Sequence, residues 1–384
     1  FEEQNQFSQE FQFNYMSEAV SAIAGLYYFD EHDITESGLF GPVIDLVTNS
    51  ENDQNNTSYA AYLNVDYLLN DKLTLTAGLR YTKEEKEFSR LQQFFVTDMS
   101  YKPTLGEGDL TITDFTTKDE WSSVSPKVAL SYYVDKDVMF FGSVSKGFKS
   151  GGFNGRSNTP DEAESYKPEN MWSYEMGIKS DLMDDRLRVN ATIIRNDYKD
   201  VQLSSFIADD QGTFSALFTN AGKALINGLE LEVSLAATDN LTLITNVGLM
   251  DAKYKEYIGP GGLNIANEKE LVNTPKTSAQ FALQYEIDTQ SFGHFTFVAD
   301  ANYRSKTYPT VSSSEILAED SRVLLNANIN FFSSNEKWIV RLGLKNISDE
   351  KYISHGFDLS DSELSQLAYY GAPRTVSLSA NYLF

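Results

Sequence analysis

Histidines and carboxylates are the side chains of this sequence that could bind a metal ion or move a proton. The three histidines, His32, His294 and His355, lie far apart in the chain, no two of them have metal-ligand spacing, and no HExxH pattern occurs. We therefore predict solvated histidines and no metal site. Acidic runs at 84–87, 161–164 and 358–363 could hide a glycosidase pair, but a sequence does not set the separation that such a pair needs. We interpret them as solvated acidic loops.

A glycine-rich stretch, "SKGFKSGGFNG", is the next candidate for chemistry. It lacks the GxxxxGK[ST] order of a phosphate loop and does not lead into a helix pattern. A flexible loop that brings Lys146, Lys149 and Arg156 near an anionic ligand is the alternative that we keep. The sequence has no cysteine, so disulfides, thiolate metal sites and cysteine nucleophiles are excluded. We predict no catalytic residue, no enzyme activity and no cofactor.

Charge and hydropathy narrow the class of protein. The 384 residues carry a formal net charge of −24, which would repel a phosphate backbone, so we predict no nucleic-acid partner. No stretch approaches the roughly 20 apolar residues of a membrane-spanning helix. A soluble protein and a membrane β-barrel both remain, because the strands of a barrel alternate and give no long apolar run.

Alternation of apolar and polar residues runs through the whole chain. In "KLTLTAGLRY", "GLELEVSL" and "WIVRLGLKN" every second residue is apolar, and the terminal "RTVSLSANYLF" repeats the pattern. Period two over about ten residues predicts strands with one apolar and one polar face. The connections between strands are of two kinds that alternate along the chain, seven short polar turns and seven long loops. We expect these loops at Asp33–Thr57, Leu91–Trp121, Lys149–Glu169, Ala208–Asn220, Ile258–Lys276, Thr307–Asp320 and Asp349–Pro373.

This arrangement predicts about fifteen strands, with all short turns at one end and all long loops at the other. Outer-membrane barrels have this asymmetry. A β-sandwich also alternates, but its strands are usually about 5–6 residues long, shorter than many strands here. Aromatic residues at strand ends, such as Trp338 and Tyr382, are typical of the girdles at membrane interfaces. We favour an antiparallel transmembrane up-and-down β-barrel over the sandwich.

Several stretches resemble TonB-dependent outer-membrane receptors. These are Ser125–Gly155, Tyr166–Ser180, Asn220–Ser234, Leu342–Tyr352 and the terminal Gly371–Phe384. The resemblance implies an all-β barrel of roughly 22 strands with a plugged lumen. About fifteen would be present, so we expect residues 1–384 to be a partial barrel domain. The N-terminal plug, the motif that contacts TonB and the first strands would lie outside it.

The same resemblance implies a function and a set of partners. The family imports a ferric siderophore or a similar scarce nutrient across the outer membrane of Gram-negative bacteria, driven through TonB, which would bind the missing N-terminal region. The last strand resembles the signal read by the barrel-assembly machinery, with Leu378, Ala380 and Tyr382 facing lipid and Phe384 at the periplasmic interface. Outer-membrane lipid and lipopolysaccharide are further expected partners; the acidic loops could hold divalent cations against lipopolysaccharide phosphates.

Ligand contacts in this family come from inward or apical aromatic and cationic groups at the loop ends of strands. The positions that fit are Phe148, Arg156, Arg195, Tyr198, Tyr303, Arg304 and Tyr370. Two other functions stay open. A passive porin would need neither plug nor TonB, and a soluble surface-binding or carbohydrate-active β-protein would need no membrane.

Overall fold

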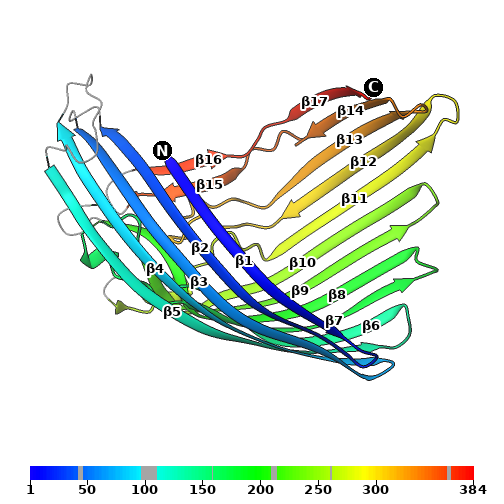
Figure 1. Cartoon of the computed structure of the whole chain (residues 1–384). Coiled ribbons are helices and arrows are strands. Elements are labelled where there is room, and N and C mark those ends of the chain that lie inside the picture. The colour runs from blue at the N-terminus through cyan, green and yellow to red at the C-terminus, as the bar shows by residue number, and fades with distance from the viewer. Residues whose placement is uncertain (42–45, 97–109, 158, 209–213, 260–261, 361–364) are drawn as a thin grey trace.

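Fifteen strands form one antiparallel sheet in the computed structural model (Figure 1), which describes residues 1–41, 46–96, 110–157, 159–208, 214–259, 262–360 and 365–384. The sheet order follows the chain from β1 to β14 and ends with β17. Its strands are β1 (Glu2–Met16), β2 (Val20–Gly41), β3 (Leu46–Asn70), β4 (Leu73–Val96), β5 (Leu110–Tyr133), β6 (Val138–Lys149), β7 (Glu169–Leu182), β8 (Leu187–Ala208), β9 (Phe214–Ala236), β10 (Leu241–Tyr257), β11 (Thr277–Asp288), β12 (Gly293–Arg304), β13 (Arg322–Ser333), β14 (Trp338–Lys345) and β17 (Thr375–Tyr382). The predicted strand number and antiparallel up-and-down order are confirmed. β1 and β17 are the two edges of this sheet, which curves into an open trough (Figure 1).

Short turns join the strands at one end, as predicted. They lie at 17–19, 71–72, 134–137, 183–186, 237–240, 289–292 and 334–337. The sequence of the turn between β7 and β8 suits its backbone conformation. Asp184 and Asp185 have φ angles of 54° and 63°, a left-handed conformation that aspartate tolerates better than most residues.

Three of the expected long loops are largely strand, which corrects the predicted boundaries. β2 and β3 stay paired as far as Gly41 and Leu46, and β4 and β5 as far as Phe94 and Leu110. β8 and β9 stay paired as far as Ala208 and Phe214. Beyond the membrane both faces of a sheet meet water, so a ladder of backbone hydrogen bonds can continue without apolar alternation. A prediction based on alternation therefore misses the loop-side ends of these strands.

The last expected loop also contains structure. β15 (Ile353–Asp358) and β16 (Gln366–Tyr370) pair with each other in a separate two-stranded sheet. Apart from two 3₁₀ turns, at Asp161–Ala163 and Ala266–Glu268, the described residues contain no helix. Consistently, none of the described helical segments has the length and hydrophobicity to cross a membrane.

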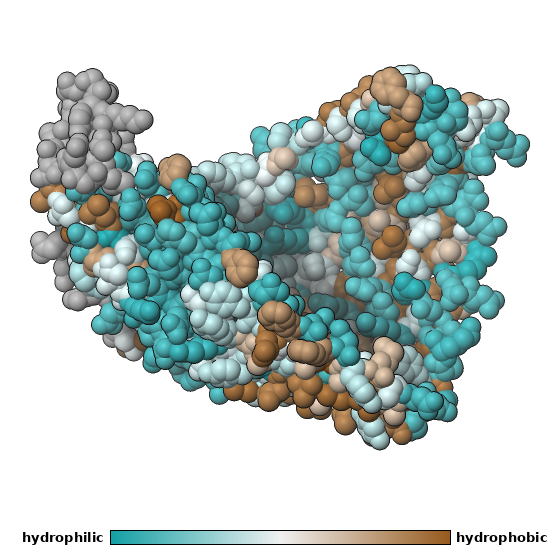
Figure 2. All heavy atoms as spheres, viewed as in Figure 1, coloured by the Kyte–Doolittle hydropathy of each residue, from teal (hydrophilic) through white to brown (hydrophobic). Residues whose placement is uncertain are grey.

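The register aligns apolar side chains in rows on one face of the sheet, here called the outer face. One row runs through Met176, Ile193, Leu229 and Leu249, which lie opposite one another on consecutive strands. They are exposed, Met176 by 68% and Ile193 by 60%. Figure 2 shows hydrophobic residues gathered along the convex underside of the trough, while its hollow is mostly hydrophilic. No second sheet covers these rows among the described residues, so the sandwich alternative is wrong.

Candidate ligand-binding site on the inner face

A hollow of about 300 Å³ lies on the polar, inner face where β2, β3 and β4 meet the end of β6. The inward positions of β2 and β4 pair across β3, so Tyr27, Ala60 and Thr82 form one row and Phe29, Ser58 and Glu84 the next. The hollow is lined by Tyr27, Phe29, Ser58, Arg80, Thr82, Glu84, Phe148 and Ser150.

Arg80 is the cation of this hollow. Its guanidinium carbon lies 5.6 Å from the centre of the Tyr27 ring and 5.7 Å from that of the Tyr62 ring. Its Nε donates to Thr82 Oγ1 at 3.1 Å, and no carboxylate of the described residues lies within salt-bridge distance of it. Tyr62 is fixed in turn, because its ring lies over Gly25 and its hydroxyl donates to Glu10 Oε1 at 2.7 Å. A cation held between rings without a counter-ion can receive an anionic, partly aromatic ligand group.

An aromatic layer continues on the inner face toward the loops. Phe88 and Phe153 are buried and stack with ring centres 6.0 Å apart at 11°. Trp121 contacts Phe153 at 5.9 Å, and Lys86 Nζ lies 5.8 Å from the Trp121 ring centre. Trp121 belongs to β5 and pairs with Glu84. The sequence prediction placed it at the edge of a loop, and so missed it.

Arg90 of β4 fastens the glycine-rich segment 150–157 to the inner face. Its Nε donates to the Ser157 carbonyl at 2.8 Å, and its Nη1 donates to Asn52 Oδ1 and to the Gly155 carbonyl at 2.7 and 2.9 Å. Its Nη2 donates to Gln92 Oε1 at 3.2 Å. Arg90 is only 6% exposed and Ser157 is fully buried. The expectation of a flexible loop is therefore wrong for this segment, because a charged group holds it at two carbonyls.

The glycines of this segment are needed for close approach. A side chain at Gly151 would collide with the Trp121 ring, and one at Gly152 would collide with the Tyr166 ring. Gly152 and Tyr166 form a backbone bridge across the same segment. The glycine-rich composition thus serves packing inside the lumen rather than phosphate binding.

A second inner cluster surrounds Tyr198. Tyr198 lies opposite Met171 and Ala224 in the register and packs against a buried group of Ala224, Tyr254 and Tyr257. The two tyrosine rings of that group meet edge to face at 5.1 Å. Tyr198 is therefore inward, as predicted for a ligand contact, but it lies in a packed cluster and not among the residues that line the Arg80 hollow.

Arg304 ends β12 on the inner face, opposite Arg322. Its Nη2 donates to the Asn273 carbonyl at 3.1 Å, while its buried Nε has no partner among the described residues. Arg322 pairs with Glu319 at 3.2 Å and lies 3.9 Å from the centre of the Tyr352 ring. Arg304, Arg322 and Glu319 together therefore carry one surplus positive charge near the loop end of the sheet.

The segment between β12 and β13 carries a smaller charged group outside the membrane-spanning strands. Lys306 and Tyr308 both donate to the carboxylate of Glu315. The hydrogen bond from Lys306, followed by that from Tyr308, lowers the pKa of Glu315. Glu315 is exposed and the other two side chains are partly exposed, so this group contributes little to stability.

The other predicted ligand residues do not gather around the Arg80 hollow. Arg195 and Tyr303 lie on the outer face, Arg195 opposite Tyr174 and Tyr303 opposite Val323. They share the parity of the apolar residues of their strands, so the strand pattern extended to the loop end would have placed them outward. Tyr370, in β16, is 68% exposed, and Arg156 is an exposed part of the fastened segment. Of the seven, only Phe148 lines the hollow.

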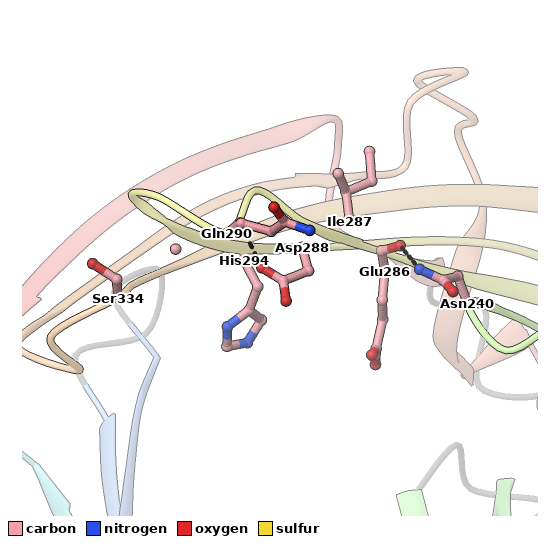
Figure 3. A pocket seen from close by; sticks show the side chains of 8 residues that line it. Asn240, Glu286, Ile287, Asp288, Gln290, His294 and Ser334 are labelled. Carbon is pink, nitrogen blue, oxygen red and sulfur yellow. Dashed lines mark hydrogen bonds between the residues drawn. The ribbon is translucent and has the colours of Figure 1, made fainter.

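A second hollow, of about 400 Å³, lies at the turn end of β11 and β12. Figure 3 shows Glu286, Asp288 and His294 on one side of this hairpin and Ile287 on the other. The His294 ring stacks on Phe332 at 4.6 Å, beside a short turn as predicted. Within the part of the chain that the structure describes, no three histidine or acidic side chains gather closely enough to hold a metal ion.

The end of the chain combines an apolar row with an aromatic group. Leu378 lies opposite Leu342, Ala380 opposite Val340 and Tyr382 opposite Trp338. The Tyr382 ring lies 4.9 Å from Trp338 and 5.2 Å from Phe384. The predicted outward parity of the last strand is confirmed by this register, while its role as an assembly signal stays a prediction.

These features define the class. A single up-and-down sheet with short turns at one end, an exposed apolar outer face and a polar inner face is the wall of an outer-membrane barrel. The family model described as "TonB dependent receptor-like, beta-barrel" matches residues 1–347, and the chain belongs to this family. Its members are β-barrel proteins of the Gram-negative outer membrane, so the resemblance and the location predicted from the sequence are confirmed.

Individual relatives are distant and longer. The chain is 23% identical over 334 residues to the probable TonB-dependent siderophore receptor PiuA of Acinetobacter baumannii, covering 85% of this chain and 40% of PiuA. It is 28% identical over 174 residues to the metal-pseudopaline receptor CntO of Pseudomonas aeruginosa, covering 45% of this chain and 22% of CntO. Among solved structures, the ferric yersiniabactin uptake receptor FyuA of Yersinia pestis superposes with a TM-score of 0.79 at 18% identity, covering 99% of this chain and 54% of FyuA. The chain thus spans less than half the length of these two curated relatives.

Proposed function

We propose that this chain is the C-terminal part of the barrel of an outer-membrane receptor that imports a ferric siderophore or a similar metal chelate. Energy would reach it through TonB. The family supports transport by a receptor, and the names of PiuA and CntO support a metal chelate as the cargo. The particular chelate depends on side chains of this chain, which differ from those of its relatives at most positions.

The observation that carries the proposal is the unpaired Arg80 between two tyrosine rings in an inward hollow. Many metal chelators coordinate through anionic oxygen atoms, and a guanidinium without a counter-ion complements such groups. The segment 150–157, fastened to the inner face by Arg90, begins beside this hollow, which Ser150 lines. A defined binding hollow on the inner face favours a receptor over an open porin.

We propose further that a plug domain, the TonB-contacting motif and the first strands belong to sequence outside these 384 residues. The chain covers 40% of PiuA and 54% of FyuA, which supports a longer receptor. The backbone groups of β1 and β17 along the sheet edges lack partners in this sheet, and hydrocarbon does not tolerate unpaired backbone. The chain expressed alone should therefore import nothing.

Uptake of radiolabelled iron by the complete receptor tests the function. We expect uptake of at least one anionic ferric chelate, loss of that uptake in cells without TonB, and none with the chain alone. Arg80→Gln should lower the apparent affinity about tenfold, since a hydrogen bond to a charged group contributes about 1.5–3 kcal/mol. Arg341→Gln is the matched control. Arg341 is also inward, but it lies on β14, opposite Asn330 and Ser379 of the neighbouring strands, and not on the strands that line the Arg80 hollow.

Two results would contradict the proposal. Uptake that persists without TonB would make the protein a passive porin. TonB-dependent uptake that is equally weakened by Arg341→Gln and Arg80→Gln would keep the receptor but remove the Arg80 hollow as its binding site.

A further inference from the structure

Neutral amide side chains gather on the inner face of β10–β13. They are here called the amide wall and comprise Asn246, Gln280, Gln284, Asn302, Asn326, Asn328 and Asn330. The register brings them together, because Gln280 lies opposite Asn246 on one side and opposite Asn302 on the other. Asn246 Nδ2 donates to Gln280 Oε1 at 2.9 Å. The Arg80 hollow is built mainly on β2–β4, so β5–β9 separate it from this wall.

The carboxylate inside the amide wall, Asp300, is already hydrogen-bonded. Its Oδ2 accepts from the side-chain amides of Asn302 and Asn326, the latter at 2.7 Å. The remaining amides of the wall are neutral, and a neutral hydrogen bond is exchanged for one with water at small net cost. The wall therefore offers a hydrophilic cargo several weak contacts in succession rather than one tight contact.

Two hollows follow each other along the inner face of β11. The upper one, of about 430 Å³, includes Asn246, Ser278, Gln280 and Asn302 in its lining, together with Gly248, where a Cβ would lie 2.8 Å from Ser278 Oγ. The lower one is the hollow of about 400 Å³ at the turn end of β11 and β12. The inward positions between them are Ala282, whose side chain is small, and Gln284 of the amide wall.

The lower hollow suits release of an anionic cargo. Figure 3 shows Glu286 and Asp288 on the same side of the hairpin, and they share the parity of Gln280 and Gln284. The eight residues from Gln280 to Asp288 span about 27 Å along the strand, so the two hollows and the positions between them form a long path. Conduction requires contacts that are weak enough for the cargo to leave. Carboxylates at the turn end meet this requirement, because they repel an anionic chelate that reaches them.

We propose that the cargo crosses the receptor along the amide wall of β10–β13, after it leaves the Arg80 hollow on the other part of the sheet. The inner face is thus divided into a part that binds the chelate and a part that lets it pass. During transport the plug separates from the amide wall, because neutral amide contacts are replaced by water more readily than the cation–aromatic contacts of β2–β6. This inference rests on the proposed function, since it assumes an anionic chelate that is moved through TonB.

Single cysteines in the complete receptor test the route, because these 384 residues contain no cysteine. Gln284→Cys places a thiol on the amide wall, four residues from the turn-side end of β11 at Asp288. Thr76→Cys is the matched control, since Thr76 is inward on β4, three residues from the turn-side start of that strand at Leu73. Cysteines elsewhere in the receptor are replaced by serine. Each variant is labelled with fluorescein maleimide in cells that transport unlabelled chelate, and binding and uptake are then measured with the radiolabelled ferric chelate found in the uptake assay.

We expect labelled Gln284→Cys to lose uptake about tenfold with unchanged affinity for the chelate, since passage depends on the free width of the path. Labelled Thr76→Cys should keep both. Labelling of Gln284→Cys should also be faster in cells with TonB and chelate than in cells without either. Undiminished uptake by labelled Gln284→Cys, or an equal loss in labelled Thr76→Cys, would overturn the proposed route. Absence of TonB-dependent uptake already in the unsubstituted receptor would instead overturn the proposed function.

Discussion

Leu342→Arg tests which face of the sheet meets lipid. Leu342 lies on the outer row between Ile329 and Leu378, four residues from Trp338 at the turn-side rim. Four residues at about 3.4 Å each, tilted by about 45°, raise it about 10 Å above that rim. Half the height of the apolar band is about 12 Å. Leu342 is therefore close to the midplane of the bilayer.

An arginine at the midplane of an outer-membrane barrel costs about 2–4 kcal/mol when it faces lipid. We expect Leu342→Arg to lower the free energy of unfolding of the complete receptor by that amount. Asn328→Arg is the matched control at the same height, because Asn328 is inward and lies opposite Gly343, whose missing side chain leaves room. Gly343 itself is a poor control, since a Cβ there would lie 2.7 Å from Ser377 Oγ.

Denaturant titration of the receptor folded into lipid vesicles measures both variants. The expected result is a large loss for Leu342→Arg and a clearly smaller one for Asn328→Arg. Equal losses, or a larger loss for Asn328→Arg, would refute the assignment of the outer and inner faces.

Two further outcomes follow from contacts within the chain. Arg90→Ala should release segment 150–157, raising hydrogen exchange of its amides roughly 30-fold, which corresponds to about 2 kcal/mol for lost charged hydrogen bonds. Lys149→Ala, at an exposed position just before the segment, should leave exchange unchanged, and unchanged exchange in Arg90→Ala would contradict the anchoring role. Tyr382→Ala, which removes a ring that contacts both Trp338 and Phe384, should lower the amount of folded receptor in the outer membrane several-fold. Leu383→Ala, on the opposite parity, should not, and equal yields of the two would remove the terminal aromatic group as an assembly signal.

The strand number, the turns and the facing of the apolar rows could be predicted because each depends on local sequence. Alternation at "KLTLTAGLRY" and a short polar turn before it are enough to define β4 and its orientation. The upper part of the same strand could not be predicted in this way. Residues 83–96 do not alternate, because charged residues lie on both faces of 83–87 and apolar residues on both faces near Phe94 and Phe95, so only pairing with β3 and β5 makes them strand.

The candidate site could be predicted less well, because it joins residues that are distant in sequence. Phe148 was found from its position at a strand end. Arg80 and Trp121 were not, although both have aromatic or cationic character, since one lies within a strand and the other in an expected loop. An inward parity count along β4 would have found Arg80, whereas its position between the rings of Tyr27 and Tyr62 depends on register across three strands.

The contact between Arg90 and Ser157 spans 67 positions of the chain, whereas neighbouring strands mostly pair through adjacent hairpins. It can form only after β4, β5 and β6 are aligned, because the arginine and the two carbonyls come from opposite ends of that three-strand unit. Closure of such a long loop is entropically costly and therefore late. Protection of the Gly155 amide against hydrogen exchange would therefore report a late step in the folding of the receptor, one that follows the alignment of β4, β5 and β6.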